Sequence, residues 1–172
     1  KSIPYEGSET LADGSEISRP GYTFAGWNTA DDGTGQDYAA GAVYTMPAED
    51  VTLYAKWTQD SYTLNYKANG GSGNIDPQTG IFYKASVNLD TGGAISREGH
   101  SFAGWNTKAD GSGDKTYAGG SSFEMPDGDV TLYAQWTKNR YSLSHDVNGG
   151  EGTIAKQTGI SYDALVKADS GK

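Results

Sequence analysis

Apolar and polar residues alternate along several short stretches of this chain. From Tyr62 to Ala68, every second residue is apolar or aromatic and the residues between them are polar or charged. A period of two is typical of a β-strand that has one buried face. The same alternation runs from Val51 to Trp57 and from Val130 to Trp136. The pattern therefore predicts a β-strand over each of these three stretches.

Turn residues separate the predicted strands. Asn69-Gly70-Gly71 follows the strand that begins at Tyr62, and an Asn-Gly pair readily adopts the positive φ angles of a tight hairpin turn. The glycine-rich stretch 110–114 is expected to be another turn. Pro126 precedes the last strand, where a residue without an N–H removes nothing from the strand ladder. Short strands joined by tight turns are therefore expected throughout.

A further extended segment is expected over residues 81–89, with two counterparts elsewhere in the chain, residues 3–11 and 160–166. Another strand is expected through Phe102. Helix signal is weak, and the sequence allows at most one short helix, between residues 84 and 97. The expected fold class is mostly β, or α+β.

Two strings of residues occur twice in the sequence. Residues 21–29 read Gly-Tyr-Thr-Phe-Ala-Gly-Trp-Asn-Thr, and residues 99–107 repeat them with His and Ser in place of the first Tyr and Thr. Residues 51–58 return as residues 130–137 with one change, Lys56 to Gln135. The offset is 78 residues for the first pair and 79 for the second. A tandem array suggests that the protein provides length, spacing or multivalent binding, rather than one catalytic pocket.

The repeat divides the chain into three parts. Residues 1–59 form a partial repeat that lacks its first strand and hairpin, and residues 60–138 form a complete repeat. Residues 139–172 carry the N-terminal part of a third repeat, with Tyr141, Leu143 and Asn148 at the positions of Tyr62, Leu64 and Asn69. A repeat of this size buries only about 60% of its unfolded surface, so it gains stability from packed neighbours.

Composition supports this picture and excludes several classes of protein. The chain has 25 glycines and 12 tyrosines but no cysteine, so its core must be filled largely by aromatic residues and without disulfides. A net charge of −9 repels nucleic acid and anionic membranes. No apolar stretch approaches the roughly 20 residues that cross a bilayer, and no signal peptide is present. The chain opens in the middle of a repeat, which we interpret as an internal fragment.

The repeated residues resemble a known family. Gly-Tyr-Thr-Phe-Ala-Gly-Trp at residues 21–27, an Asp-Gly-x-Gly turn, Tyr-x-Met-Pro at residues 44–47 and Val-Thr-Leu-Tyr-Ala-x-Trp at residues 51–57 are similar to the Listeria–Bacteroides repeat, which includes the B repeats of internalin-type surface proteins. The resemblance implies tandem β-grasp-like modules, related to ubiquitin and SUMO. It also implies an extracellular location, on the bacterial cell surface or secreted, with no catalytic residues.

The two histidines are the first candidates for metal binding or acid–base chemistry. His100 occupies the position of Tyr22, and His145 occupies the position of Tyr66. A metal ligand that the sister repeat replaces with tyrosine is more simply read as a packing residue. Neither histidine is therefore expected to form a site.

The acidic turns at residues 31–37 and 110–114 faintly resemble calcium-binding loops. An EF-hand needs oxygen ligands at alternating positions and a distal bidentate Glu, which neither stretch supplies. Aspartate and glycine are also the residues that a tight turn requires. The plain turn is the favoured interpretation, and no metal or other cofactor is expected.

Aromatic residues are the remaining candidates for binding. The four tryptophans could stack on sugar rings, but their phase with apolar neighbours favours the core; they are Trp27, Trp57, Trp105 and Trp136. Tyr54 and Tyr133 lie off the apolar face and are candidates for an exposed interaction surface, although cross-strand packing explains them equally well. A lysine–asparagine isopeptide bond is a further possibility that the sequence leaves open.

Three kinds of partner are expected: neighbouring repeats of the same protein, another copy of the chain by strand addition, and a host protein or glycan. The second follows from the frame of the repeats, because the part that residues 1–59 lack is present in residues 139–172. Nucleic acid and membrane insertion are not expected. No catalytic constellation is present, so the first hypothesis is a non-catalytic stalk or spacer of a bacterial surface protein. The alternative is an adhesive module that binds through exposed tyrosines and loop residues.

Overall fold

Short β-strands and glycine-rich turns make up this protein, seen in a computed structural model that describes residues 3–165. Within those residues no segment is helical. The chain divides into two compact units, and the division falls inside three of its strands. Unit 1 holds residues 1–63, 79–85 and 124–128, and unit 2 holds residues 64–78, 86–123 and 129–172.

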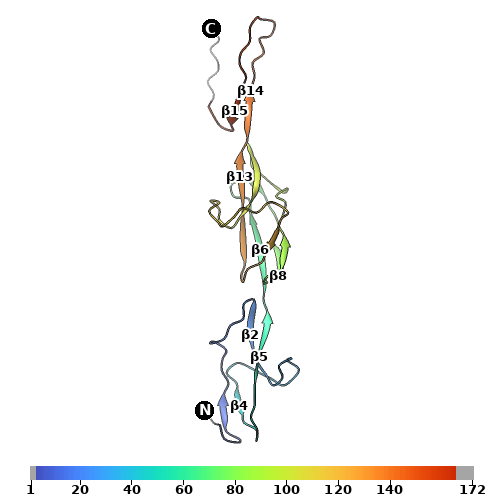
Figure 1. Cartoon of the computed structure of the whole chain (residues 1–172), viewed down its shortest axis with the longest axis vertical. Helices are drawn as coiled ribbons and strands as arrows, with labels where there is room; N and C mark the ends of the chain where they lie inside the picture. Colours follow the sequence, from blue (N-terminus) through green and yellow to red (C-terminus); the bar gives the residue numbers. More distant parts are fainter. Residues whose placement is uncertain (1–2, 166–172) are drawn as a thin grey trace. The chain divides into compact units, whose positions relative to one another are not determined.

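Unit 1 contains the first, partial repeat. Its strands are β1 (Ser8–Thr10), β2 (Tyr22–Asn28), β3 (Asp37–Tyr38), β4 (Val43–Thr45) and β5 (Tyr54–Gln59). β2 pairs antiparallel with β3 on one side and with β5 on the other, while β1 pairs with β4. Figure 1 shows β2 and β5 side by side. Alternating strand residues thus form a three-stranded and a two-stranded sheet, as the period of two predicts.

Aromatic rings fill the interior of the partial repeat, but they are not fully covered. Phe24 packs edge-on against Trp27 and Trp57, with ring centroids 5.2 and 5.6 Å apart. Tyr38 packs edge-on against Tyr44 at 5.1 Å. All five side chains are only half-buried. The partial repeat therefore has an aromatic core that is open on one side.

The complete repeat lies mostly in unit 2, although its residues 60–63, 79–85 and 124–128 belong to unit 1. Its strands are β6 (Ser61–Lys67), β7 (Ser72–Gly73), β8 (Gln78–Phe82), β9 (Ser86–Asn88), β10 (Ile95–Ser96), β11 (His100–Asn106), β12 (Ser122–Glu124) and β13 (Val130–Lys138). Four of them form a mixed sheet in the order β11-β13-β6-β8, and β9/β12 and β7/β10 form separate pairs. The strands predicted over residues 62–68 and 130–136 are confirmed.

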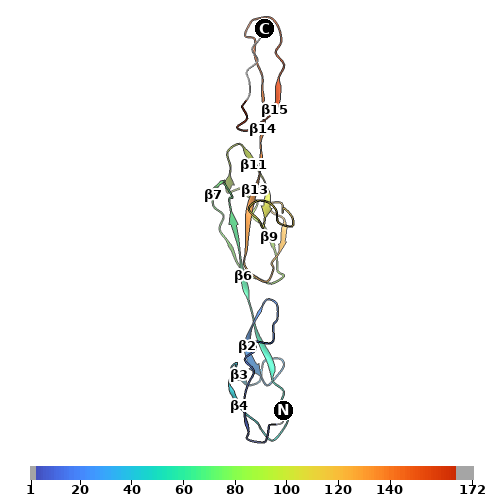
Figure 2. The ribbon, with the colours of Figure 1, turned by 90° about the vertical axis from the view of Figure 1, so that its left-hand side faces the viewer.

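Parallel pairing of β6 with β13 closes the core of unit 2. Val130 lies opposite Leu64, and Leu132 lies opposite Tyr66. Figures 1 and 2 show these two strands at the centre of the repeat. Side chains from both strands and from β11 are fully buried: Leu64, Leu132, Ala134 and Trp105 are all 0% exposed. At about 25 cal/mol per Å² of apolar surface, these side chains contribute much of the stability of the repeat.

The string Phe-Ala-Gly-Trp forms the same β-bulge in both repeats. The register of β11 against β13 shifts between Phe102 and Gly104, and β2 shifts against β5 at the same place in the first repeat. Gly104 has φ 127°, and a side chain there would meet the carbonyl oxygen of Tyr117 at 2.4 Å. Only glycine fits such a close approach of two backbones. The bulge turns Trp105 into the core.

One expectation about the segment after the first turn was wrong, and the short helix that the sequence allowed there is not formed. Residues 81–89 are not one extended segment, because the chain turns between β8 and β9, where Lys84 has φ 60°. Glu6 and Asp163, at equivalent positions, also have positive φ. No helix forms between residues 84 and 97, which hold β9, β10 and turns. Of the counterpart at 160–166, residue 166 lies outside the described residues.

The third part of the chain forms a hairpin. β14 (Arg140–Leu143) pairs antiparallel with β15 (Gln157–Ser161). The equivalent strands of the complete repeat, β6 and β8, are also neighbours in their sheet. Tyr141 and Leu143 are 49% and 39% exposed, whereas Leu64 at the equivalent position of the complete repeat is 0% exposed. The hairpin therefore has the strands of a repeat but not its core.

Candidate interaction surface

The two tyrosines predicted to form an interaction surface lie in equivalent strands but in different surroundings. Tyr54 in β5 is 42% exposed and is in register with Asn28 of β2. Tyr133 in β13 is half-buried, because it is in register with Asn106 on one side and with Lys67 of β6 on the other. The structure thus presents Tyr54 more openly than Tyr133, and a binding role for either stays a prediction.

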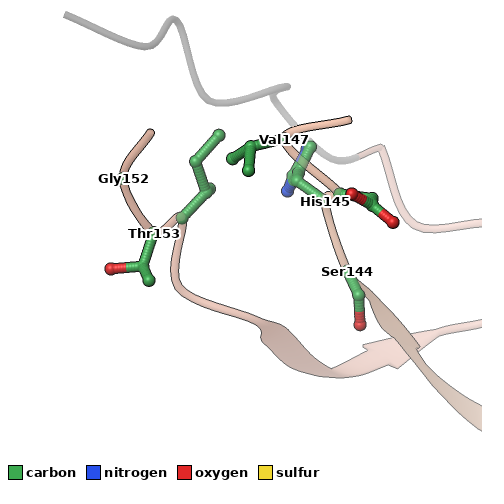
Figure 3. A pocket seen from close by; sticks show the side chains of 7 residues that line it. Ser144, His145, Val147, Gly152 and Thr153 are labelled. Carbon is green, nitrogen blue, oxygen red and sulfur yellow. The ribbon is translucent and has the colours of Figure 1, made fainter. Parts of the chain in front are cut away.

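The two histidines lie in different places. The Nδ1 atom of His100 is 2.7 Å from the carbonyl oxygen of Glu98, and its ring packs edge-on against Tyr162 with centroids 6.0 Å apart. His145 lines a shallow hollow in the hairpin together with Val147 and Thr153 (Figure 3). Among the described residues, no group of three or more His, Cys, Asp or Glu side chains could hold a metal ion.

Two buried asparagines organise the acidic turns, and the sequence patterns did not predict them. Asn106 is 0% exposed, and its amide donates to the carbonyl oxygens of Gly111 and Lys115, each at 3.2 Å. Its side-chain oxygen accepts from the N–H groups of Lys108 and Gly113 at 2.8 and 3.1 Å. Asn28 repeats this arrangement in the first copy. The sequence does contain a signal for them, because the same asparagine occurs in both copies of the string Gly-Trp-Asn-Thr.

The aspartates of these turns are occupied by hydrogen bonds within the turns. Asp32 accepts from the hydroxyl and the N–H of Thr34, at 2.7 and 3.0 Å, and Asp110 accepts from the N–H of Ser112 at 3.0 Å. Hydrogen bonds from the Thr34 and Ser112 hydroxyls, then from their backbones, lower the pKa of both carboxyl groups. The acidic loops are therefore Asx turns arranged around a buried asparagine.

A recurring cluster of contacts lies at each boundary between repeats. At the first, the N–H of Asp60 donates to the carbonyl oxygen of Gly21 at 2.9 Å, and the Asp60 carboxylate accepts from the Thr23 hydroxyl at 2.8 Å. The Cα of Gly21 packs so closely on Tyr83 that a side chain would lie 2.4 Å from its Cβ. The N–H of Gly21 also donates to Asp127 at 3.1 Å.

The second boundary repeats the first within unit 2. The N–H of Asn139 donates to the carbonyl oxygen of Gly99 at 2.8 Å, and its side-chain oxygen accepts from the Ser101 hydroxyl at 2.6 Å. A side chain on Gly99 would lie 2.0 Å from the ring of Tyr162, whose own N–H donates to the Asn139 carbonyl at 3.0 Å. These boundary contacts join each repeat to the start of the next, so we name them the repeat junctions.

The last feature of the surface is a pair of hollows. The first hollow is lined by residues 12–17 and Trp27, and the second is lined by residues 30–33 and 54–57 together with Arg19 and Asn28. The indole N–H of Trp27 donates to the Ala12 carbonyl at 2.8 Å, at the back of the first hollow. Both hollows lie within unit 1.

Comparison with known proteins identifies the repeat. The family model of the Listeria-Bacteroides repeat domain matches residues 2–56 and 62–135. The chain belongs to the Listeria-Bacteroides repeat family. The members of this family are repeats found in bacterial surface proteins. Membership agrees with the two strings of residues that each occur twice in this sequence.

Relatives of this family member are long bacterial proteins. A putative Gly-rich membrane protein of Evansella cellulosilytica is 42% identical over 145 residues, and these span 81% of this chain and 17% of that protein. Internalin H of Listeria monocytogenes is 35% identical over 139 residues, spanning 80% of this chain and 23% of internalin H. The chain thus spans less than a quarter of the length of these relatives.

Two further comparisons complete the description of this Listeria-Bacteroides repeat chain. A putative membrane protein of Evansella cellulosilytica is 32% identical over 144 residues, which span 83% of this chain and 21% of that protein. No solved structure matches the chain significantly. Within residues 3–165 there is no helix with the length and apolar character to cross a membrane.

Proposed function

We propose that this segment is a non-catalytic spacer in an extracellular protein, on the bacterial cell surface or secreted, and that it separates the domains on either side of it. The observation that carries the proposal is the pair of repeat junctions. Two features occur at both boundaries. One is a glycine packed on a tyrosine, and the other is a polar residue held by the N-terminal end of β2 or of β11. A chain of freely jointed domains needs no such contacts, whereas a spacer of fixed reach does.

The proposal includes a β-grasp-like fold for each complete repeat. It is supported by the order β11-β13-β6-β8, in which the first and last strands of the repeat, β6 and β13, pair in parallel at the centre, with β8 outside β6 and β11 outside β13. A β-grasp module has the same strand order in its sheet, which supports the proposal. The described residues hold turns and short strands where such modules carry a helix.

The extracellular location rests on family membership and on the relatives. Their names include an internalin and a Gly-rich membrane protein. A chain with no cysteine, a charge of −9 and closely packed aromatic residues is compatible with that setting, because disulfides are permitted outside the cell but are not required there.

Spin labels test the spacer proposal, since the chain has no cysteine of its own and label sites can be chosen freely. One pair, Ala40→Cys with Thr79→Cys, spans the first junction inside unit 1. A second pair, Ala109→Cys with Lys156→Cys, spans the second junction inside unit 2. All four positions are exposed. Double electron–electron resonance should give one narrow distance distribution for each pair. Distributions as broad as those of a flexible linker would refute the spacer.

A second candidate function is adhesion to a host protein or glycan through Tyr54, Tyr133 and neighbouring loop residues. The observation in its favour is that Tyr54 is 42% exposed at the rim of a hollow. Glycan arrays and host-protein binding assays test it, comparing the wild type with the Tyr54→Ala and Tyr133→Ala double variant. Binding that the double variant loses would establish adhesion, and a clean negative leaves the spacer.

A further inference from the structure

We propose that the parallel pairing of β6 with β13 is a load-bearing clamp, through which a complete repeat transmits tension along the chain without unfolding. The clamp consists of residues 64–67 and 130–133, all within unit 2. The proposal rests on the spacer function and adds to it. A spacer keeps its reach under load only if its repeats stay folded when the domains on either side are pulled apart.

Tension reaches the complete repeat through the outer ends of these two strands. Only Asp60 lies between β5 and β6, and only Asn139 lies between β13 and β14. A single residue spans at most about 3.6 Å, and the backbone N–H of each of these two residues is held in its repeat junction. The linkers therefore absorb almost none of a pull, which is applied at Ser61, where β6 begins, and at Lys138, where β13 ends.

The relative direction of the two strands decides how the pull acts on them. β6 and β13 are parallel, so the start of β6 and the end of β13 lie at opposite ends of the pair (Figure 1). Pulling these ends apart slides one strand along the other and loads all the hydrogen bonds between them at the same time. In an antiparallel pair the loaded ends would be neighbours, and the bonds would open one after another. Rupture of several hydrogen bonds together has a higher barrier than rupture of one at a time, and forced unfolding is governed by that barrier.

Buried side chains oppose the same sliding motion. Residues 64–67 lie opposite residues 130–133, pair by pair. Leu64 and Leu132 are fully buried, and Tyr66 is nearly so. A slide by one residue would put apolar positions of one strand opposite polar positions of the other, so the next register that keeps both apolar faces inward is two residues away. The strands therefore have no nearby register in which the clamp could form again under load.

Two side chains extend the clamp beyond its backbone pairs. The Asn69 amide donates to the carbonyl oxygen of Ala134 at 2.9 Å. The Trp136 indole N–H donates to the carbonyl oxygen of Ala68, also at 2.9 Å. Each of these bonds joins the segment after β6 to β13, past the last pair of the register. Both bonds must therefore break before the strands can slide.

The turn that follows β6 is packed on the same strand. A side chain on Gly71 would lie 2.7 Å from the Trp136 ring and 2.6 Å from the carbonyl oxygen of Ser96. The Asn69 amide also donates to the carbonyl oxygen of Ala109 at 2.7 Å. The turn cannot move along β13 without losing these contacts, so it adds to the resistance of the clamp.

The antiparallel pair beside the clamp has the opposite mechanical geometry. β11 and β13 place Ser101 opposite Thr137, near one end of their pair. Force applied to these two residues peels β11 from β13 and breaks the hydrogen bonds between them in turn. Both geometries use β13, so they can be compared within one protein.

Single-molecule force spectroscopy in two pulling directions tests the clamp, because the chain has no cysteine and handles can be attached at chosen sites. The 172-residue chain carries Ser61→Cys with Thr137→Cys for the pull along the clamp, or Ser101→Cys with Thr137→Cys for the matched peeling pull. All three positions are exposed. Each hydrogen bond that must break together with the others lengthens the lifetime about five-fold. At the same constant force, we therefore expect the lifetime before the first rupture to be at least about ten-fold longer along the clamp. Equal lifetimes, or a longer lifetime in the peeling pull, would overturn the proposal.

An Asn69→Gly variant tests the side-chain part of the clamp. Asn69 has φ 50°, which glycine adopts without strain, so the substitution removes the amide and keeps the turn. We expect the lifetime along the clamp to fall about five-fold. The peeling pull should be unchanged, because it begins at the other end of β11. The matched control Asn148→Gly makes the same substitution at φ 46° outside the clamp and should change neither lifetime. An equal loss in both pulling directions would mean general destabilisation and would overturn the role of Asn69.

The spin-label experiment separates this proposal from the spacer function on which it rests. Narrow distance distributions together with equal lifetimes in the two pulling directions would refute the clamp and leave the spacer standing. Broad distributions would refute the spacer and, with it, the role of the clamp, whichever direction gives the longer lifetime. Narrow distributions with the longer lifetime along the clamp would support both.

Discussion

Asn106→Ala should be among the most destabilising single changes outside the apolar core. The side chain is 0% exposed and makes hydrogen bonds to four backbone groups of the turn at residues 107–115. A net contribution of about 1 kcal/mol for each bond, reduced where water can enter the turn, gives a loss of about 3 kcal/mol. For a repeat of this size, that corresponds to a fall in melting temperature of roughly 12–24 °C.

Urea denaturation and amide hydrogen exchange measure this effect. The N–H of Gly113, which donates to the Asn106 side-chain oxygen at 3.1 Å, should lose most of its protection. Lys108→Ala is the matched control, because that side chain is exposed and the backbone N–H of the residue remains. Its effect should stay within about 0.5 kcal/mol. If Asn106→Ala costs less than about 1 kcal/mol and Gly113 stays protected, the buried asparagine does not organise the turn.

Three further outcomes are expected. Gly99→Ala should loosen the second repeat junction and broaden the spin-label distance distribution there, because the new methyl group would lie 2.0 Å from the Tyr162 ring. The control Gly41→Ala should leave that distribution unchanged, because Gly41 also has a positive φ but no atom lies within 4 Å of its added methyl group. The Asp110 carboxyl should titrate below 3.8 in an NMR titration, because the Ser112 hydroxyl and N–H bind its ionised form and lower its pKa. Its stabilising effect is therefore present above about pH 4 and lost as the pH falls through the lowered pKa, and a midpoint at or above 3.8 would contradict the Asx-turn assignment. A chelator should not change the melting temperature, and a fall of several degrees would indicate a metal site.

Much of the strand arrangement could be predicted from residue periodicity. The strands over residues 62–68 and 130–136 were found because one face of each is buried and the other is not, which imposes a period of two. The Gly-Trp bend and the Asn-Gly turn were found from turn chemistry. The expected tight hairpin does not form there, because the strand after the turn, β7, pairs with β10 and not with β6. Comparison of the two copies also argued against a site at either histidine, because the sister repeat has a tyrosine at each of these positions.

The remaining features depend on tertiary contacts that periodicity does not encode. The turn at Lys84 places a lysine at φ 60°, a conformation that non-glycine residues seldom adopt, so the sequence reads as one extended segment there. Nothing in the periodicity marks Asn28 and Asn106 as buried, because their burial follows from the turn folding back over them. The difference between Tyr54 and Tyr133 depends on whether a β6-like strand lies alongside.

The central claim is that this family member acts as a spacer whose repeats are joined by ordered junctions. Small-angle X-ray scattering on chains carrying two, three and four tandem copies of residues 60–138 tests the claim most directly. The account predicts that the maximum dimension increases by the same amount with every added repeat. A dimension that instead grows with about the square root of the number of repeats, as in a flexible chain, would contradict it.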